Sequence, residues 1–363
     1  MARYLRVAAW TLAGAAAAAA AVVYGAMLIG EQKAGRTLDV RVAPVAYRDD
    51  AASIAHGKYL FESRGCMECH GAAAGGRQVF DDPGGLQVRA PDLTRGNPEI
   101  AHYQPIDWVR SIRHGVAPSG RPLLVMPSED YNRLSDDDLA ALVAYLRSLP
   151  PGLGAPAEIR MPWFVRAMYG AGFIRDAASK IDHKLPPSPA LAPSVTVQYG
   201  GYVANACLGC HRADLRGGKI PGAPPDWPPA ADLRPVSGGA MARYDRASSF
   251  IAMMRSGKRP DGSAISGVMP FDSFGRMNDT DLSALYLYLA SCGTEPSALR
   301  RAQYRPAAMP GSSTQRCSSI ASSSASAASM AKRTSCNPYW SGASSGISRL
   351  MPSMTVGWTR YSA

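Results

Sequence analysis

The fold of this 363-residue chain is decided by two pentapeptides, Cys66-Met67-Glu68-Cys69-His70 and Cys207-Leu208-Gly209-Cys210-His211. Two cysteines separated by two residues and followed directly by histidine form the pattern that haem c attachment requires. Each thiol adds to a haem vinyl group, and the adjacent imidazole then faces the iron. We therefore predict two covalently bound haem c groups, held by Cys66, Cys69, Cys207 and Cys210, with His70 and His211 as iron ligands.

A Met-Pro pair follows each pentapeptide, 56 residues after the first histidine and 58 after the second. A methionine thioether raises the reduction potential of a haem and fills the last coordination position, which leaves no open site for a substrate. The other candidates for this sixth coordination position are His102, His114, Met253, Met254 and Met277. Only Met126 and Met269 occupy equivalent places in both halves, so the sequence predicts them as the sixth iron ligands.

The cysteines allow two other interpretations, a zinc site or a purely structural role. A structural zinc site needs four closing ligands, which neither pentapeptide supplies. Three of the seven cysteines lie beyond the pentapeptides, at Cys292, Cys317 and Cys336, so no even disulfide framework is implied.

The two halves also repeat each other outside the pentapeptides. Helical spacing of apolar residues over 136–148 predicts a closing helix, begun by a cap at Ser135 and Asp138 and packed at Gly57 against the helix before the first pentapeptide. Arg113 and Arg255, at repeated positions, are expected either to pair with haem propionates or to lie solvated at the surface. The matched segments are Gly57-Lys58-Tyr59-Leu60 with Gly200-Gly201-Tyr202-Val203, Pro91-Asp92-Leu93 with Ala231-Asp232-Leu233, and the closing helices around Asp138 and Asp281. The repeat indicates a duplicated domain.

The N-terminus carries a 24-residue uncharged run, Val7 to Gly30, after Arg3 and Arg6. As a helix this run is about 36 Å long, enough to cross a hydrocarbon core of about 30 Å. We expect an uncleaved inner-membrane anchor, with a cleaved signal and a soluble periplasmic protein as the alternative. Both place the haem domains in the bacterial periplasm, because basic residues stay on the cytoplasmic side.

The C-terminal segment has a different composition from the rest of the chain. From Gly311 to Ala363 there are 16 serines in 53 residues and no acidic residue. Such a segment buries too little apolar surface to offset its ordering entropy, so we expect disorder; a reading-frame change near the Ser291 codon is a further possibility. From Gly293 onward the net charge is +7 of the formal +11, so the charge gives no reason to infer a nucleic-acid partner.

These features predict a mainly α fold, all-α apart from loops. Residues 151–195, rich in proline, are expected to link the two domains. Their apolar patch, 161–174, should pack across the domains or touch the membrane surface, and His183 should be a linker residue. The expected boundaries are 1–30 for the signal-anchor helix, 31–50 for a linker, 51–150 for the first haem domain, 151–195 for the second linker, 196–291 for the second haem domain and 292–363 for the tail.

Both halves resemble class I cytochrome c domains, in which the helix bearing the attachment motif crosses a C-terminal helix beside the haem. The first half is more particular, because it has Gly75-Gly76, Asp82-Pro83-Gly84-Gly85, Ala90-Pro91-Asp92-Leu93-Thr94, Asp107-Trp108 and Arg113-His114-Gly115 in that order. That order resembles the cytochrome c subunits of membrane-bound bacterial alcohol and sugar-acid dehydrogenases. The resemblance implies a subunit that passes electrons from a catalytic partner to the respiratory chain, although many such subunits carry three haems.

The sequence therefore favours a periplasm-facing dihaem electron carrier that is not itself an enzyme. Its expected partners are redox proteins, namely a dehydrogenase or quinol-linked donor and a cytochrome or terminal oxidase. The alternatives are a haem enzyme, such as a dihaem peroxidase or a sulfur-compound oxidoreductase, and a permanent subunit of a dehydrogenase or oxidase complex. A haem enzyme would need one displaceable ligand, and a Met-Pro pair in both halves argues against it.

Overall fold

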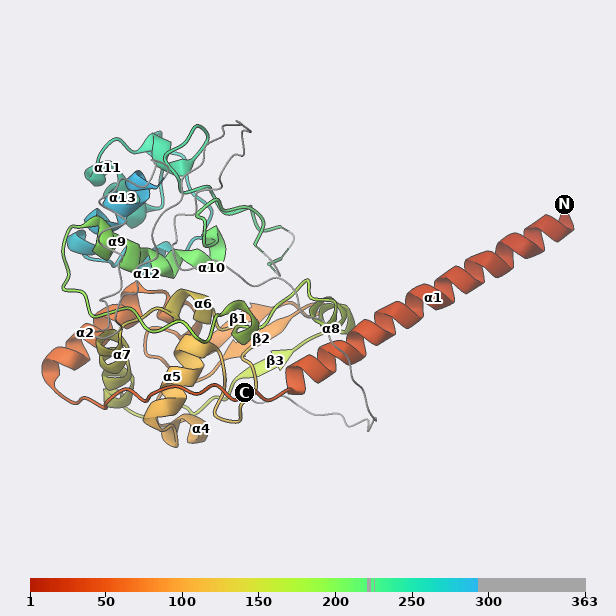
Figure 1. The fold of residues 1–363 in the computed structure, drawn as a ribbon, viewed down its shortest axis with the longest axis horizontal. Coiled ribbons are helices and arrows are strands. Elements are labelled where there is room, and N and C mark those ends of the chain that lie inside the picture. The colour runs from red at the N-terminus through yellow and green to blue at the C-terminus, as the bar shows by residue number, and fades with distance from the viewer. Residues whose placement is uncertain (221–222, 225, 293–363) are drawn as a thin grey trace, which may run out of the picture.

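The computed structural model describes residues 1–220, 223–224 and 226–292. Two mainly helical domains stack on each other, and one long helix projects from the first domain (Figure 1). This confirms the expected fold class in its main features. The segment 293–363, expected to be disordered, lies outside the described residues.

The first domain follows the long helix α1, Ala2–Gly35. Its two main helices, α2 (Ala51–Ser63) and α7 (Asp136–Ser148), pack against each other, and the first pentapeptide forms α3 (Cys66–His70), which contacts α2. The domain also contains α4 (Pro98–Ala101), α5 (Pro105–His114) and α6 (Ser128–Tyr131).

A small antiparallel sheet interrupts the helices and corrects the expectation of an all-α fold. Strands β1 (Arg77–Asp81) and β2 (Gln87–Ala90) form a hairpin, and β3 (Glu158–Arg160) pairs with the free edge of β2. The turn between β1 and β2 is closed by Gly85 N–H, which donates to the Asp82 carbonyl at 3.0 Å. The Asp82-Pro83-Gly84-Gly85 turn separates the two short runs, and only β2 alternates in exposure.

The predicted crossing of the first and last helices is confirmed. A Cβ atom on Gly57 of α2 would lie 1.9 Å from the Ala141 carbonyl oxygen of α7, so only glycine allows this approach. The cap is present as well, since Ser135 Oγ accepts a hydrogen bond from Asp138 N–H at 3.1 Å. The apolar face of α7 then lies in the core of the first domain.

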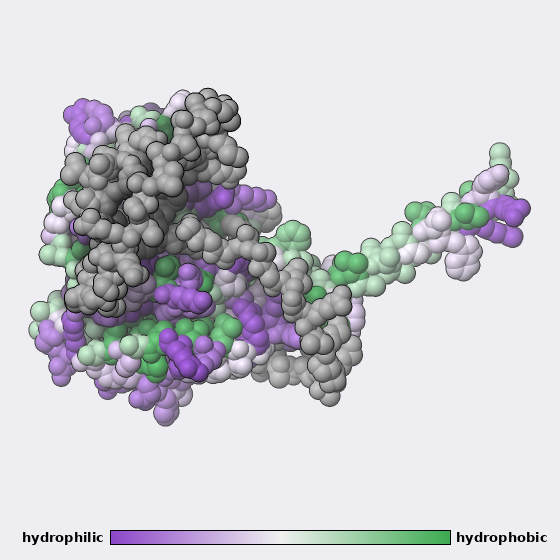
Figure 2. Space-filling view, viewed as in Figure 1, coloured by the Kyte–Doolittle hydropathy of each residue, from purple (hydrophilic) through white to green (hydrophobic). Residues whose placement is uncertain are grey.

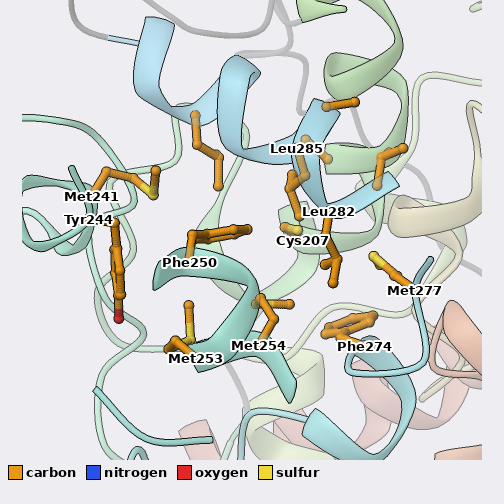
Figure 3. Packing of buried hydrophobic residues seen from close by; sticks show 14 of the residues in the cluster. Cys207, Met241, Tyr244, Phe250, Met253, Met254, Phe274, Met277, Leu282 and Leu285 are labelled. Carbon is orange, nitrogen blue, oxygen red and sulfur yellow. The ribbon is translucent and has the colours of Figure 1, made fainter. Parts of the chain in front are cut away.

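The second domain repeats this architecture. Gly200 on α9 approaches the Ala284 carbonyl of α13 as closely as Gly57 approaches Ala141. In its core, Phe250 and Met254 of α11 gather with Leu282 and Leu285 of α13 (Figure 3). Its helices are α9 (Val197–Val203), η2 (Ala204–Cys207), α10 (Leu208–His211), η3 (Ala240–Arg243), α11 (Ala247–Ser256), α12 (Phe271–Phe274) and α13 (Asp279–Ser291).

Residues 151–195, expected as a linker, take part in the fold of the first domain. Besides β3, they contribute α8 (Trp163–Gly170) and η1 (Ala178–Lys180). The buried Asp92 carboxylate accepts a hydrogen bond from Gly154 N–H at 2.8 Å, and Thr94 Oγ1 accepts one from Gly152 N–H at 2.7 Å. The start of this segment is thus held against the loop that follows β2.

Helix α8 packs on the end of α1, a contact that the sequence did not predict. Two glycines allow this contact, because a Cβ atom on Gly30 would lie 2.3 Å from the Arg166 carbonyl oxygen and one on Gly170 would lie 1.8 Å from that of Ala26. The Lys33 ammonium donates to the Gly170 carbonyl at 2.8 Å and so caps the C-terminal end of α8.

The two domains meet through a repeated pair of hydrogen bonds. Tyr59 of the first domain donates to the Asp281 carboxylate of the second at 2.6 Å, and Tyr202 of the second donates to Asp138 of the first. Since Tyr59 matches Tyr202 and Asp138 matches Asp281 in the repeat, the interface has approximate twofold symmetry.

One ion pair breaks this symmetry and adds to the interface. Arg64 pairs with Asp281, and both side chains are buried. Burial, the largest single effect, lowers the pKa of Arg64, but the charge of Asp281, the hydrogen bond to it and the neighbouring tyrosines together outweigh burial and raise that pKa. Asp281 also accepts from Tyr199 at 2.8 Å, so its charge is fully compensated inside the protein.

We predict that Asp281→Asn lowers the free energy of unfolding of the second domain by about 3 kcal/mol, because it leaves the Arg64 charge buried without a counter-ion. The measurement is denaturant unfolding of the haem-loaded protein. The control is Asp279→Asn on the same helix, which breaks an exposed pair with Arg255 and should cost less than about 1 kcal/mol. Equal and small losses in the two variants would contradict the role of Asp281.

Candidate haem sites

The first pentapeptide forms a short helix that turns His70 into the domain. Gly65 precedes α3 with φ of +89°, a conformation that favours glycine. The His70 imidazole is buried, and its Nδ1 lies 3.0 Å from the Pro91 carbonyl. Since a carbonyl only accepts, Nδ1 carries the proton and Nε2 keeps its lone pair. Burial lowers the pKa of His70, which maintains the neutral form that binds iron.

The second pentapeptide has the same arrangement. His211 is buried, and its Nδ1 donates to the Ala231 carbonyl at 2.8 Å. Ala231 is the residue that matches Pro91 in the repeat. Both candidate iron ligands are therefore oriented by the same backbone hydrogen bond, which fixes the tautomer and the ring plane.

The four cysteines of the pentapeptides lie beside these histidines and form no disulfide. Burial raises the pKa of the Cys66 and Cys207 thiols to about 12 each. Metal thiolate sites need deprotonated sulfur, so these surroundings suit a thioether better than a zinc ligand. Within the described ranges, no group of three or more His, Cys, Asp or Glu side chains could hold a metal ion.

A mostly apolar cavity in the first domain joins the residues proposed from the sequence. Cys66, Cys69, His70 and Met126 all line it, together with aliphatic and aromatic side chains from α5 and α7. Trp108 also lines it, and its buried indole N–H has no hydrogen-bond partner within the described part of the chain. An apolar cavity with an unpaired donor fits a haem, whose ring is apolar and whose propionates accept hydrogen bonds.

Met126 and Met269 occupy matching turns. In each turn the N–H group two residues on donates to the methionine carbonyl, at 2.9 Å in the first domain and 2.8 Å in the second. The prolines that follow have nearly the same backbone angles, φ −80° and ψ 59° for Pro127 against φ −79° and ψ 69° for Pro270. Both methionine side chains are half-buried against their domain cores. The repeat in sequence is thus also a repeat in geometry.

The other candidates for the sixth position have different surroundings. Met253, Met254 and Met277 are buried in the apolar core of the second domain (Figure 3). His102 is exposed and bonded to the Pro98 carbonyl at 2.6 Å. His114 stacks on His183 with 3.0 Å between their Nδ1 atoms, so His183 packs against the first domain.

The repeated arginines pair with acids at the start of the closing helices. Arg113 is buried and donates to Asp136 at 2.7 Å, while Arg255 is exposed and donates to Asp279 at 2.6 Å. These are the two positions expected to meet propionates or solvent. The observed partners are protein carboxylates, while Nε and Nη2 of Arg113 are buried without a hydrogen-bond partner in the described residues, so the propionate role of Arg113 stays a prediction.

The interface brings the two pentapeptides close to each other's domains, which sequence reasoning missed. The Gly209 N–H in the second pentapeptide donates to the half-buried Asp130 carboxylate at 2.5 Å, and Ser273 donates to Glu68 of the first pentapeptide at 2.6 Å. Asp130 and Ser273 each lie four residues after a Met-Pro methionine. The available signal for an interface was the repeat of Tyr59 and Asp138 as Tyr202 and Asp281, since these polar residues lie among apolar positions. Those residues form the Tyr–Asp bonds of the interface.

Comparison with known proteins places one family match on each pentapeptide. Residues 52–146 match the family model of cytochrome c oxidase, cbb3-type, subunit III, and residues 200–293 match that of cytochrome c.

Several relatives of this chain are named as dehydrogenase subunits. The cytochrome c subunit of alcohol dehydrogenase (quinone) from Gluconobacter oxydans is 27% identical over 314 residues, which cover 74% of this chain and 62% of the relative. The cytochrome c subunit of gluconate 2-dehydrogenase from Pantoea cypripedii is 25% identical, with 70% and 63% covered. The fructose dehydrogenase cytochrome subunit of Gluconobacter japonicus is 30% identical over 36% of this chain and 28% of its own length.

The aligned part spans about three fifths of the length of the first two relatives. The matches nevertheless agree with the geometry, because each family model covers one pentapeptide, its Met-Pro turn and the closing helix. The chain therefore carries two cytochrome c domains in tandem, with two covalently bound haem c groups, and is similar over 70 to 74% of its length to cytochrome c subunits of bacterial dehydrogenases.

Proposed function

We propose that this chain is a membrane-anchored, periplasm-facing electron carrier that serves a dehydrogenase as its cytochrome subunit. The observation that carries the proposal is the duplicated site, in which a buried histidine and a Met-Pro turn recur with the same local geometry in two joined domains. The relatives support the partner class, since their names place them with alcohol, gluconate and fructose dehydrogenases.

The iron ligands in this proposal are His70 with Met126 and His211 with Met269. A haem c bound by histidine and methionine supplies reversible one-electron chemistry at a raised potential. The residues of the chain supply the setting for it. Two backbone carbonyls orient the imidazoles, apolar side chains keep water from the cavity, and Trp108 offers an N–H to a propionate. Two methionine ligands leave no vacant position for a substrate.

The domain interface suits a relay rather than two independent carriers. Asp130 binds the backbone of the second pentapeptide, and Glu68 of the first pentapeptide binds Ser273. The buried Arg64–Asp281 pair and the two Tyr–Asp bonds hold this arrangement. Because both attachment motifs adjoin the interface, electrons can pass between the domains without a conformational change.

The contacts of α1 support an anchor that is retained. Its 34 residues include a strongly apolar window with no residue buried in the protein. The end of α1, in contrast, is part of the folded body. Arg36 donates two hydrogen bonds of 2.9 Å to the buried Asp176, which also accepts from Tyr169 at 2.7 Å. Removal of a signal within this helix would expose the α8 surface that Gly30 covers.

The ligand assignment predicts the effect of Met126→Ala and Met269→Ala. Each variant should lower the potential of one haem, by on the order of 100 mV, because a thioether is replaced by solvent. Each should also remove about half of the weak thioether-to-iron absorption at the red end of the oxidised spectrum. Met254→Leu, which changes a buried core methionine, is the control and should keep the full absorption. Full absorption in both alanine variants would refute the assignment.

The anchor predicts that the mature protein keeps α1. Intact mass or N-terminal sequencing of protein purified from membranes should show residues before Glu31 present. A mature chain that begins beyond about residue 25 and is recovered in the soluble periplasmic fraction would contradict this.

The carrier function is tested on purified, fully haem-loaded protein. Coulometric titration should give reversible uptake of one electron by each domain, and addition of the partner dehydrogenase with its substrate should reduce both. The isolated chain should show no sustained turnover of peroxide, thiosulfate or alcohol. Turnover of one of these above about 1 per second, the low end of ordinary enzyme rates, would identify a catalytic haem instead.

A further inference from the structure

Helix α8 and the turn after it carry large apolar side chains on the surface of the first domain. Trp163 is 60% exposed, Phe164 39%, Met168 41% and Phe173 71%. The opposite side of α8 is buried, with Val165 and Tyr169 in the protein. Trp163 and Phe164 lie edge to face with ring centroids 5.9 Å apart, and the Phe173 N–H donates to the Met168 carbonyl at 2.9 Å, which holds Phe173 beside α8. We call Trp163, Phe164, Met168 and Phe173 the α8 patch.

The position of the α8 patch along α1 is fixed by close backbone contacts. Gly30 and Gly170 allow α8 to touch α1 between Ala26 and Gly30, and Glu31 of α1 pairs with Arg166 of α8 at 3.1 Å. Lys33 caps the end of α8. These contacts join the two helices into one unit, so the α8 patch cannot move along α1.

That position is the end of the apolar run. About 20 helical residues cross a hydrocarbon core, and the 24-residue run that begins at Val7 reaches this length near Ala26. The next residues, Met27 to Gly30, then lie at the membrane interface together with α8. Figure 2 shows the apolar colouring of α1 continuing to the place where it joins the body.

The chemistry of the α8 patch suits this level of the bilayer. Tryptophan is enriched at membrane interfaces, and phenylalanine and methionine can bury in the acyl boundary. Arg175, exposed two residues after Phe173, can meet lipid phosphates. Beneath the patch, Arg36, Asp176 and Tyr169 bond to one another.

We infer that the α8 patch is a second membrane contact, which binds the lipid surface of the bilayer crossed by α1 and fixes the orientation of the haem domains above it. The inference rests on the retained anchor of the proposed function. Two contacts, one through the bilayer and one along its surface, prevent the body from rotating freely about α1. The occupant is lipid because the patch is continuous with the helix that spans the lipid.

The test is photolabelling of the full haem-loaded chain in vesicles of phosphatidylethanolamine and phosphatidylglycerol that contain a phospholipid with a diazirine near the glycerol end of one acyl chain. Peptides are mapped by mass spectrometry. The peptide that carries Trp163 to Phe173 should be labelled at least about tenfold more than the peptide that carries Leu287, because burial in lipid favours large apolar side chains. Leu287 of α13 is the matched control, since it is 37% exposed and lies in the other domain.

A variant isolates the side chains that make the contact. Trp163→Gln combined with Phe173→Gln should lower labelling of the α8 peptide severalfold while labelling of α1 stays unchanged. Both side chains are exposed, so the haem spectra should also stay unchanged and report an intact fold. Leu287→Gln, the control substitution, should change neither label.

The outcomes separate this inference from the anchor. If α1 is labelled but the α8 peptide is labelled no more than the α13 peptide, the α8 contact is overturned and the anchor stays in place. The occupant of the patch is then a protein partner. A mature chain without α1 that is still labelled at α8 supports the contact and overturns the anchor. Absence of label at both overturns both.

Discussion

The close crossing of two helices at a glycine is the constraint on which each domain depends. Gly57 under Ala141 and Gly200 under Ala284 bring the backbones of the crossing helices into contact. The pentapeptide follows directly after the first of these helices, and the Met-Pro turn lies shortly before the second. A side chain at either glycine would separate the helices and move these two segments apart, so the crossing sets the width of the haem cavity.

The second constraint is the charge buried between the domains. A carboxylate inside a protein is tolerated only when it is paired and hydrogen-bonded, and Asp281 meets Arg64, Tyr59 and Tyr199 at once. The equivalent Asp138 meets His56 at 2.7 Å and Tyr202. Duplication of the domain supplied both halves of this arrangement, because each copy carries the tyrosine that the other copy's aspartate accepts from. The pairing of the domains is therefore specific rather than a general apolar contact.

Segments outside the two repeated domains determine how the haem domains are positioned relative to α1. Residues 151–195 do not run freely from one domain to the other. They add a strand to the sheet, pack α8 on α1 and place His183 against His114. The end of α1 is fixed to the body by Arg36 and Asp176, so a helix with the composition of an anchor is also a structural element of the first domain. These contacts fix α1 and α8 relative to the first haem domain.

The sequence by itself determined the attachment chemistry, the duplication and the helix crossing. These inferences came from local or repeated signals, namely cysteine spacing, the Met-Pro pairs and the glycines. A residue that recurs at the equivalent position of the other half supports the role predicted for it in the first. It also indicated a mainly helical fold, but it missed the sheet, because strands of three to five residues leave little periodicity. Only the tertiary structure decided the partners of Asp281 and Asp130 and the place of α8. Those contacts join residues as far as 222 positions apart, and their energy comes from burial and charge pairing, which no local pattern encodes.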